Sequence, residues 1–309
     1  MTVIALVILP VFLLIFLGWL LRRRQFPGEG FWAPAERLTY FCFFPVLLAT
    51  TLARADFSEL EVLPMAGAIV AAILVMTLAL LLARPLLESR FGLGGPGFTS
   101  LYQGAVRMNT YIGLAVAFGV AGEAGVAAAA VAVAAIVPLV NLLCVSFLAR
   151  FGTAAQPTPS GLIKQVATNP LILGCAAGGL LNVTGIGLPP VLGETLLILG
   201  SAALPLGLLC VGAALDLQAA RAAGRPVLLS SLLKLAVLPA LTWAGCWLLG
   251  VEGTAAFVAV LFNGLPTATS AYILARQLGG DATLMASLIT AQTLLAMLTL
   301  PLVLAPLVP

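Results

Sequence analysis

Ten long apolar segments are the feature of this chain that most constrains its fold. Apolar residues make up 62% of the 309 positions and charged residues only 8%, whereas soluble domains are about 45–50% apolar and about 25% charged. A run of about 20 apolar residues can cross a bilayer as a helix. The sequence therefore predicts an all-α integral membrane protein with ten transmembrane helices, at Val3–Leu21, Ala35–Ala53, Val62–Ala83, Gly97–Gly119, Gly125–Ala149, Gln165–Leu181, Pro190–Leu215, Pro226–Leu249, Thr254–Leu278 and Ala282–Pro306.

The composition narrows the classes of chemistry. The chain has no histidine, the commonest metal ligand and general base. Its five cysteines stand singly in apolar segments without CxxC spacing, which predicts neither a metal site nor a disulfide framework. We therefore expect no catalytic residues, no metal, no cofactor and no enzyme activity. A few basic loops account for the net charge of +3, so no nucleic-acid partner is expected beside the lipid bilayer.

Basic residues are distributed unevenly between alternate connections of the ten segments. Eleven lie in connections on one side, and Arg54 alone lies on the other. Basic loops stay in the cytoplasm, so this bias predicts a multi-pass membrane protein with both termini outside. Arg22, Arg23 and Arg24 follow the first segment directly, a polarity opposite to that of a signal peptide, so we expect that segment to be retained as a span.

The two halves of the chain resemble each other weakly at an offset of 160 residues. Five spans in each half would place the halves in opposite orientations, an arrangement typical of secondary transporters. We expect the repeats at residues 1–150 and 163–309, joined by a linker at 151–162. The matched pairs are Pro45 with Pro205, Asp56-Phe57 with Asp216-Leu217, Gly104 with Gly264, Leu114-Ala115 with Leu274-Ala275, and Gly119 with Gly279.

The matching fourth and ninth segments carry residues that interrupt helices near the middle of the bilayer. In the ninth, Gly264 is followed by Pro266, which cannot donate a backbone hydrogen bond. In the fourth, Gly104 precedes Arg107. Paired broken helices mark the substrate site of inverted-repeat carriers, so we expect helix breaks at Gly104, Gly264 and Pro266. A simple proline kink with Ser/Thr packing is the alternative for the ninth segment.

Arg107 is the most informative charged residue, because it lies at the centre of the fourth segment. A charge at that depth costs about 3 kcal/mol on insertion scales, and every acidic residue maps to a loop or a span end. An anionic substrate would neutralise it, aided by the positive N-terminal ends of two half-helices. A structural arginine bonded to backbone carbonyls is the alternative.

The sequence contains few residues that could bind a coupling ion within the membrane. Lys234 either snorkels to the cytoplasmic end of the eighth segment or has a function of its own. No intramembrane Asp, Glu or His offers a proton relay, so the default is an anion carrier driven by its own gradient and the membrane potential.

Short motifs that stand in a fixed order along nearly the whole chain carry a family resemblance. They are Leu9-Pro10 to Arg22 with Gly18, Arg107 to Gly113, Pro138 to Asn141, Asn169-Pro170, Pro205 to Gly212, and Pro266 to Ala275. In these the sequence resembles bacterial members of the auxin efflux carrier family. The resemblance implies two inverted five-helix repeats with crossed, broken helices 4 and 9. It also implies elevator-type alternating access, with helices 1, 2, 6 and 7 as scaffold and helices 3–5 and 8–10 moving.

The same resemblance implies the class of substrate, because family members carry organic anions. Plant members have proline at both crossings and a long loop between the halves. This chain has proline at the second crossing only, and it lacks the long loop. A small mono- or dicarboxylate is therefore expected rather than auxin. The predicted substrate-binding residues are Arg107, Asn109, Thr110, Tyr111, Asn263, Pro266, Thr267, Thr269 and Tyr272.

Two other classes of function stay open at this point. The first is a sodium-coupled organic-anion symporter of the bile-acid type, which shares a ten-helix inverted-repeat design but places an acidic residue near its crossing. The second is an integral-membrane transferase, which would need His-bearing or Asp-rich motifs that this chain lacks. A homodimer is compatible with a carrier of this type, and the sequence does not test it.

Overall fold

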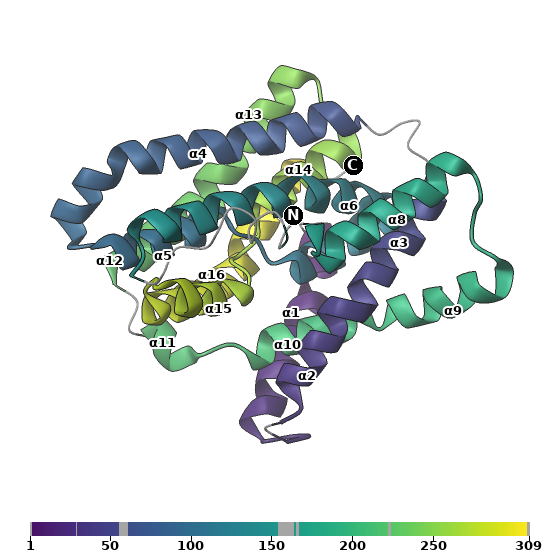
Figure 1. Ribbon diagram of the computed structural model, residues 1–309, viewed down its shortest axis with the longest axis horizontal. Coiled ribbons are helices and arrows are strands. Elements are labelled where there is room, and N and C mark those ends of the chain that lie inside the picture. Colours follow the sequence, from purple (N-terminus) through teal and green to yellow (C-terminus); the bar gives the residue numbers. More distant parts are fainter. Residues whose placement is uncertain are drawn as a thin grey trace.

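The computed structural model of the chain describes residues 2–28, 30–55, 61–153, 164, 167–221 and 224–307, and within these ranges every regular element is a helix (Figure 1). Two apolar helices are short, Pro170–Thr184 and Gly253–Gly264. The prediction of an all-α, multi-pass membrane protein is confirmed. The described segments long and apolar enough to cross a membrane are six: Ile4–Arg23, Val62–Phe91, Gly95–Phe151, Pro190–Ala213, Arg225–Leu249 and Ala282–Leu307.

Helices of the first half follow the predicted apolar segments. A kink divides the last of them into two arms, because Ala121 and Gly122 leave the helical conformation and Gly122 has a φ of 56°. Asp56-Phe57 of the predicted repeat lies outside the described residues. The helices are α1 (Thr2–Arg23), α2 (Trp32–Leu38), η1 (Thr39–Phe43), α3 (Phe44–Arg54), α4 (Val62–Phe91), α5 (Gly95–Val106) and α6 (Thr110–Phe151).

Helices of the second half are shorter and more often interrupted. Most of the predicted linker, from residue 154 on, lies outside the described residues. The helices are α8 (Pro170–Thr184), α9 (Pro190–Ser201), α10 (Ala203–Ala213), α11 (Leu217–Arg221), α12 (Arg225–Leu232), η2 (Leu233–Val237), α13 (Leu238–Leu249), α14 (Gly253–Gly264), α15 (Ser270–Leu278), α16 (Ala282–Leu304) and η3 (Ala305–Leu307).

Prolines explain where two long helices change their hydrogen-bond register. The π-helical turns η1 and η2 each begin six residues before a proline, Pro45 and Pro239 respectively. A proline within a helix has no N–H for the carbonyl one turn earlier, so the preceding turn widens to reach the next donor. Each helix continues in its direction after the turn, from η1 into α3 and from η2 into α13.

Close contacts between small residues pair the outer helices. The GxxxG motif of Gly174 and Gly178 predicts a tight helix contact, and α8 packs along α3. A Cβ atom at Gly178 would lie only 2.5 Å from the Ala49 carbonyl oxygen, so the prediction is confirmed. Likewise α1 packs along α10, α3 also contacts α9, and α4 packs along α13. Figure 1 shows these pairs around the edge of the molecule.

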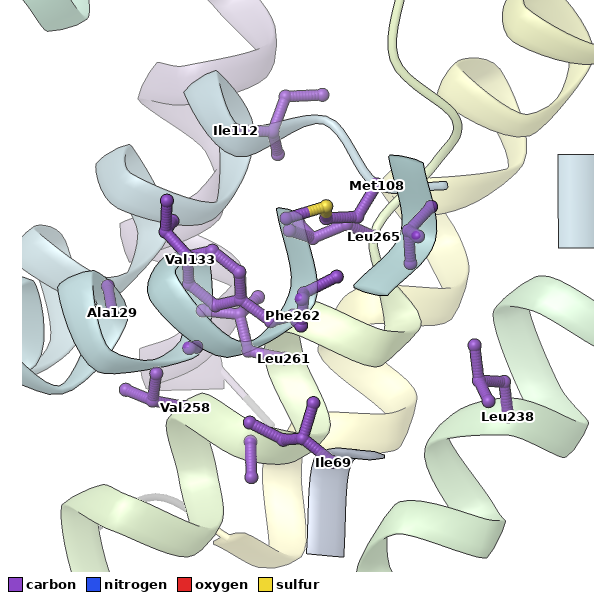
Figure 2. Close-up of a cluster of buried hydrophobic side chains, with 14 of the residues drawn as sticks. Ile69, Met108, Ile112, Ala129, Val133, Leu238, Val258, Leu261, Phe262 and Leu265 are labelled. Atoms are coloured by element: carbon purple, nitrogen blue, oxygen red, sulfur yellow. The ribbon is translucent and has the colours of Figure 1, made fainter. Parts of the chain in front are cut away.

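Two interrupted helices form the centre of the molecule. Every residue of α5 from Gly97 to Val106 and of α14 from Ala255 to Gly264 is buried. Burial is expected for α14, which is almost wholly apolar, whereas α5 also buries Thr99, Ser100 and Gln103. Neither helix continues directly: residues 107–109, the first break, separate α5 from α6, and residues 265–269, the second break, separate α14 from α15. Figure 2 shows the apolar side chains around both breaks, among them Met108 and Leu265.

Candidate functional site

The first and second breaks meet each other inside the molecule. Arg107 and Leu265, which follow α5 and α14 directly, both have extended backbones, with φ and ψ of −73° and 150° and of −69° and 149°. The Asn109 N–H donates a hydrogen bond of 2.8 Å to the Pro266 carbonyl. Gly264 is the last residue of α14, whereas Gly104 lies in the last turn of α5, three residues before the break that follows it.

The side chain of Asn109 fixes the start of α6. Its Oδ1 accepts hydrogen bonds from the N–H groups of Tyr111 and Ile112 at 3.1 and 3.4 Å, which is the geometry of a helix N-cap. The Tyr111 ring stacks on Phe44 of α3, with 4.5 Å between ring centroids and 6° between planes. The asparagine cap therefore defines the start of α6 after the first break, whereas the second break contains Pro266.

A cavity of about 480 Å³ opens beside the meeting point of the breaks, a size typical of small-ligand sites. The first residues of α6 and of α15 both line it, so the partially positive ends of two half-helices face one space. The predicted site residues that line it are Arg107, Asn109, Thr110, Tyr111 and Thr269. Other polar lining residues are Glu36, Arg37, Tyr40, Asn141, Thr168, Asn169, Ser270 and Gln277.

Arg107 supplies the cavity with unused hydrogen-bond donors. Its Nη2 lies 3.4 Å from Ser270 Oγ, a long hydrogen bond. Its Nη1 is buried, and the Cys144 thiol of α6 lies beside the guanidinium, but Nη1 makes no hydrogen bond of good geometry among the described residues. A guanidinium carries five N–H donors in a planar fork that suits a carboxylate. The cavity therefore holds a cation with free capacity for an anionic ligand.

Glu36 corrects the expectation that no acidic residue faces this region. It lies in α2, one residue after the start of the second predicted segment, and it lines the same cavity as Arg107. Its Oε1 accepts a hydrogen bond of 2.9 Å from Thr269 Oγ1. The described side chains form two ion pairs, Arg54–Glu194 and Arg84–Glu88, so Glu36 and Arg107 are not within ion-pairing distance of each other.

Thr267 is turned away from the cavity and is fully buried. Gln292 of α16 accepts hydrogen bonds from the Thr267 N–H and Oγ1 at 3.0 and 2.7 Å. The Gln292 Nε2 in turn donates to the Gly104 carbonyl at 3.0 Å, and Thr267 Oγ1 lies 3.0 Å from the same carbonyl. Pro266 is buried beside it. Most of the second break is therefore part of a closed polar network that ties α14, α16 and α5 together.

Two further predicted site residues also lie outside the cavity lining. Asn263 is buried in α14, where its Nδ2 donates to Thr242 Oγ1 at 2.7 Å and lies 3.4 Å from the Ile69 carbonyl. Tyr272 is 36% exposed on α15, with Arg276 5.9 Å from its ring. Their binding of substrate stays a prediction that the geometry does not favour.

Eight polar lining residues were missed by sequence reasoning, although three of them stand in the family motifs. Asn141, Asn169 and Ser270 belong to the motifs that carry the resemblance, and all three line the cavity. Asn169 caps α8 through bonds of 3.0 and 3.3 Å, and its Nδ2 lies 3.2 Å from the hydroxyl of Tyr40. A polar residue that stands in a family motif inside an apolar segment is the signal that could have found these three.

Among the described residues no group of three or more His, Cys, Asp or Glu side chains gathers closely enough to hold a metal ion. The lining of the cavity offers polar and ionic recognition, by the guanidinium groups of Arg37 and Arg107, by amides and hydroxyls, and by the carboxylate of Glu36.

Comparison with known proteins agrees with this arrangement. Residues 158–304 match the family described as "Membrane transport protein". A protein of Methanothermobacter thermautotrophicus described as an uncharacterized transporter is 27% identical over 299 residues, which cover 96% of this chain and 95% of that protein. Both comparisons point to a transporter rather than an enzyme. These similarities support the resemblance of the chain to membrane transport proteins of the auxin efflux carrier family.

Proposed function

We propose that this protein is a secondary transporter that moves a small organic anion, a mono- or dicarboxylate, across the bacterial cytoplasmic membrane. The observation that carries the proposal is Arg107, which lines a cavity of ligand size and whose Nη2 makes one long hydrogen bond, to Ser270 Oγ. A buried guanidinium with unused donors is stabilised by an anion. The N-terminal ends of α6 and α15, which line the same cavity, favour negative charge as well.

The architecture supports an inverted-repeat carrier. The described helices are compatible with ten passes. This count takes the two arms of α6 separately and joins α2 with α3, α9 with α10, α12 with α13, and each interrupted helix with its continuation. Asn109 and Thr269, which both line the cavity, are 160 residues apart, the offset of the sequence repeat. The two breaks then correspond to each other, as broken helices do in such carriers.

Elevator-type alternating access is supported by how the helices group. The pairs α1–α10 and α3–α8, with α9, form one set, whereas α4–α13 and α6–α14 form another. The cavity lies between these sets, with Glu36, Tyr40 and Asn169 on one wall and Arg107 and Ser270 on the other. Sliding of the second set past the first would carry the breaks, and an anion held there, across the membrane.

The orientation follows from the distribution of basic residues. Arg37 lines the cavity and Arg276 is adjacent to the lining residue Gln277, and both belong to the side that we assign to the cytoplasm. The described conformation is therefore inward-facing, with both termini outside.

Counterflow in proteoliposomes tests the proposal, because it does not depend on the charge that moves. Vesicles loaded with unlabelled malonate, malate, lactate or indole-3-acetate would be given the same anion labelled outside. Arg107→Ala removes a charged hydrogen bond, which contributes about 1.5–3 kcal/mol, so we expect its apparent affinity to fall by about 10- to 100-fold. Arg276→Ala, an arginine of the same region outside the cavity, is the matched control. Equal counterflow in wild type and Arg107→Ala would contradict the role of Arg107.

A sodium-coupled symporter is the second candidate, and Glu36 is the observation that favours it. Such carriers place an acidic residue near the crossing, and Glu36 contacts Thr269 of the second break. Counterflow that requires sodium, and loses that requirement in Glu36→Gln, would select this candidate over a sodium-independent carrier.

A further inference from the structure

Lys234 is an ionisable residue that does not line the cavity and has no role in the proposed anion site. We propose that it is the proton-binding site of the carrier: its amine takes up one proton when the anion binds and releases it when the anion leaves. This inference rests on the proposed transport of an organic anion and adds its coupling ion. It differs from the sequence expectation of an anion driven only by its own gradient and the membrane potential.

The position of Lys234 links both interrupted helices. Ser230, Lys234, Leu238 and Thr242 are spaced four residues apart and are all fully buried, so they form one inward face of the α12–η2–α13 helix. At one end of this face, Ser230 Oγ donates to the Leu101 carbonyl of α5 at 3.1 Å. At the other end, Thr242 Oγ1 accepts from the Asn263 amide of α14 at 2.7 Å. Lys234 lies between these contacts.

The packing around Lys234 does not let its side chain snorkel. The π-helical turn η2 that carries it contacts α5, α14 and α16 as well as its neighbours α12 and α13. The side chain is 0% exposed, which excludes the snorkelling alternative. Widened π turns inside long helices are frequent at functional sites.

No charged group of the packed elements compensates an ammonium there. Among the described residues, α14 and α16 carry no titratable side chain. The titratable groups of the other packed elements are Tyr102 of α5, whose hydroxyl lies 3.0 Å from Thr77 Oγ1, Arg225 at the exposed start of α12, and Cys246, three turns further along α13. The Nζ itself has no hydrogen-bond partner among the described residues.

These surroundings make the charge of Lys234 depend on the state of the carrier. An ammonium without an acceptor or a counter-charge is strongly disfavoured in a dry interior, so burial favours the neutral amine in the described conformation. Ser231 Oγ, three residues before Lys234 on the same helix, and Asn263 Oδ1, in the residue that donates to Thr242, also have no hydrogen-bond partner among the described residues. The helix face that carries Lys234 is therefore bordered by polar groups without partners among those residues.

An anion at the breaks supplies the missing counter-charge. The negative charge of a carboxylate beside Arg107 acts across a low-dielectric interior, where charges interact strongly. Anion binding therefore favours protonation of Lys234, and by linkage protonation favours anion binding equally. One proton is therefore transported with each anion. The Nζ lone pair takes H⁺ from water on one side of the membrane and returns it to water on the other.

Uptake driven by a pH gradient tests this directly. Wild type, Lys234→Met and Glu36→Gln would be reconstituted, with the membrane potential held at zero by potassium and valinomycin, and given labelled malonate or malate. With equal anion inside and outside, one coupled proton predicts about tenfold accumulation for a gradient of about one pH unit. Protein-free vesicles correct for leakage of the free acid. Equilibrium exchange without a gradient is measured on the same vesicles.

We expect wild type to accumulate the anion, and Lys234→Met to retain exchange but lose accumulation. Lys234→Gln provides the same comparison where the methionine variant aggregates. If wild type exchanges the anion but does not accumulate it in response to the pH gradient, the inference is wrong and the proposed function stands. Retained accumulation in Lys234→Met, or its loss in Glu36→Gln alone, overturns it too. Absence of exchange of either anion in wild type would remove the proposed function and this inference together.

Discussion

The first break and the second break correspond in the sequence repeat, yet their polar groups face different surroundings. The first break has no proline and presents Arg107 and Asn109 to the cavity. The second break contains Pro266 and buries Thr267 against Gln292, and only its last two residues, Ala268 and Thr269, reach the cavity. Two equivalent interruptions of a helix have thus acquired different partners.

This difference assigns substrate binding to the first break and stabilisation of the fold to the second break. The second break is held by hydrogen bonds that reach α16 and α5, two helices distant from it in the sequence. The first break is held by its own cap and one backbone bond to Pro266, and its guanidinium keeps unused donors. Substitutions in the second break should therefore reduce stability, and substitutions in the first break should reduce transport.

Gln292→Leu should give the largest effect of this comparison. It leaves the buried Thr267 N–H without its acceptor and removes a donor to the Gly104 carbonyl, which we expect to lower the free energy of unfolding by about 2–3 kcal/mol. Thermal unfolding in detergent measures this. Gln218→Leu, at an exposed glutamine of α11, is the matched control and should change little. An unaltered unfolding midpoint in Gln292→Leu would mean that the second break does not depend on this network.

Asn109→Asp should separate the two roles within a single position. Aspartate caps a helix as well as asparagine does, so the start of α6 and the unfolding midpoint should be preserved. The added negative charge faces the cavity and repels an anion, so we expect transport to fall by about tenfold or more. Asn109→Ala should instead lower stability by about 1 kcal/mol through loss of the cap. Unimpaired counterflow in Asn109→Asp would contradict anion binding at the first break.

The sequence predicted the elements far better than it predicted the partners across elements. Apolar length alone located the spans, and the spacing of Gly174 and Gly178 predicted a close helix contact, because both signals are local in the chain. The pairing of Glu36 with Thr269 joins residues 233 positions apart. No local pattern carries such a contact, and a carboxylate at the end of a span resembles an ordinary loop residue.

For the same reason, the sequence could not predict which residues of each break are buried and which line the cavity. Sequence reasoning treated Asn109, Thr267 and Thr269 alike, as polar residues beside a helix interruption. Which of them reach the cavity depends on Gln292, which approaches from α16 and turns Thr267 inward. The helical face that a residue occupies after a break depends on tertiary contacts rather than on spacing.

Glu36→Gln should have a smaller effect, on the balance between conformations. The Glu36–Thr269 hydrogen bond joins the two helix sets across the cavity, and a half-exposed contact of this kind contributes about 0.5–1 kcal/mol. Its weakening should shift the carrier away from the described conformation by about two- to fivefold. Labelling of a cysteine introduced at Asn141, in a background without the native cysteines, reports how often the cavity is open. Thr269→Val removes the same bond from the other side and should match it; labelling that rises in either variant would contradict the contact as a stabiliser of this state.

Tyr272→Ala should have the smallest effect and tests where the site ends. Tyr272 stands in the motif that begins at Pro266 and is a predicted substrate-binding residue, whereas its ring lies partly exposed on α15, outside the cavity lining and beside Arg276. Loss of an exposed ring changes stability by about 0.5 kcal/mol or less, and we expect less than a twofold change in counterflow. Tyr111→Ala, which removes a lining ring stacked on Phe44, is the contrasting variant and should impair both transport and stability. A large loss of anion affinity in Tyr272→Ala alone would mean that the binding surface continues along α15, and that another conformation brings this ring to the substrate.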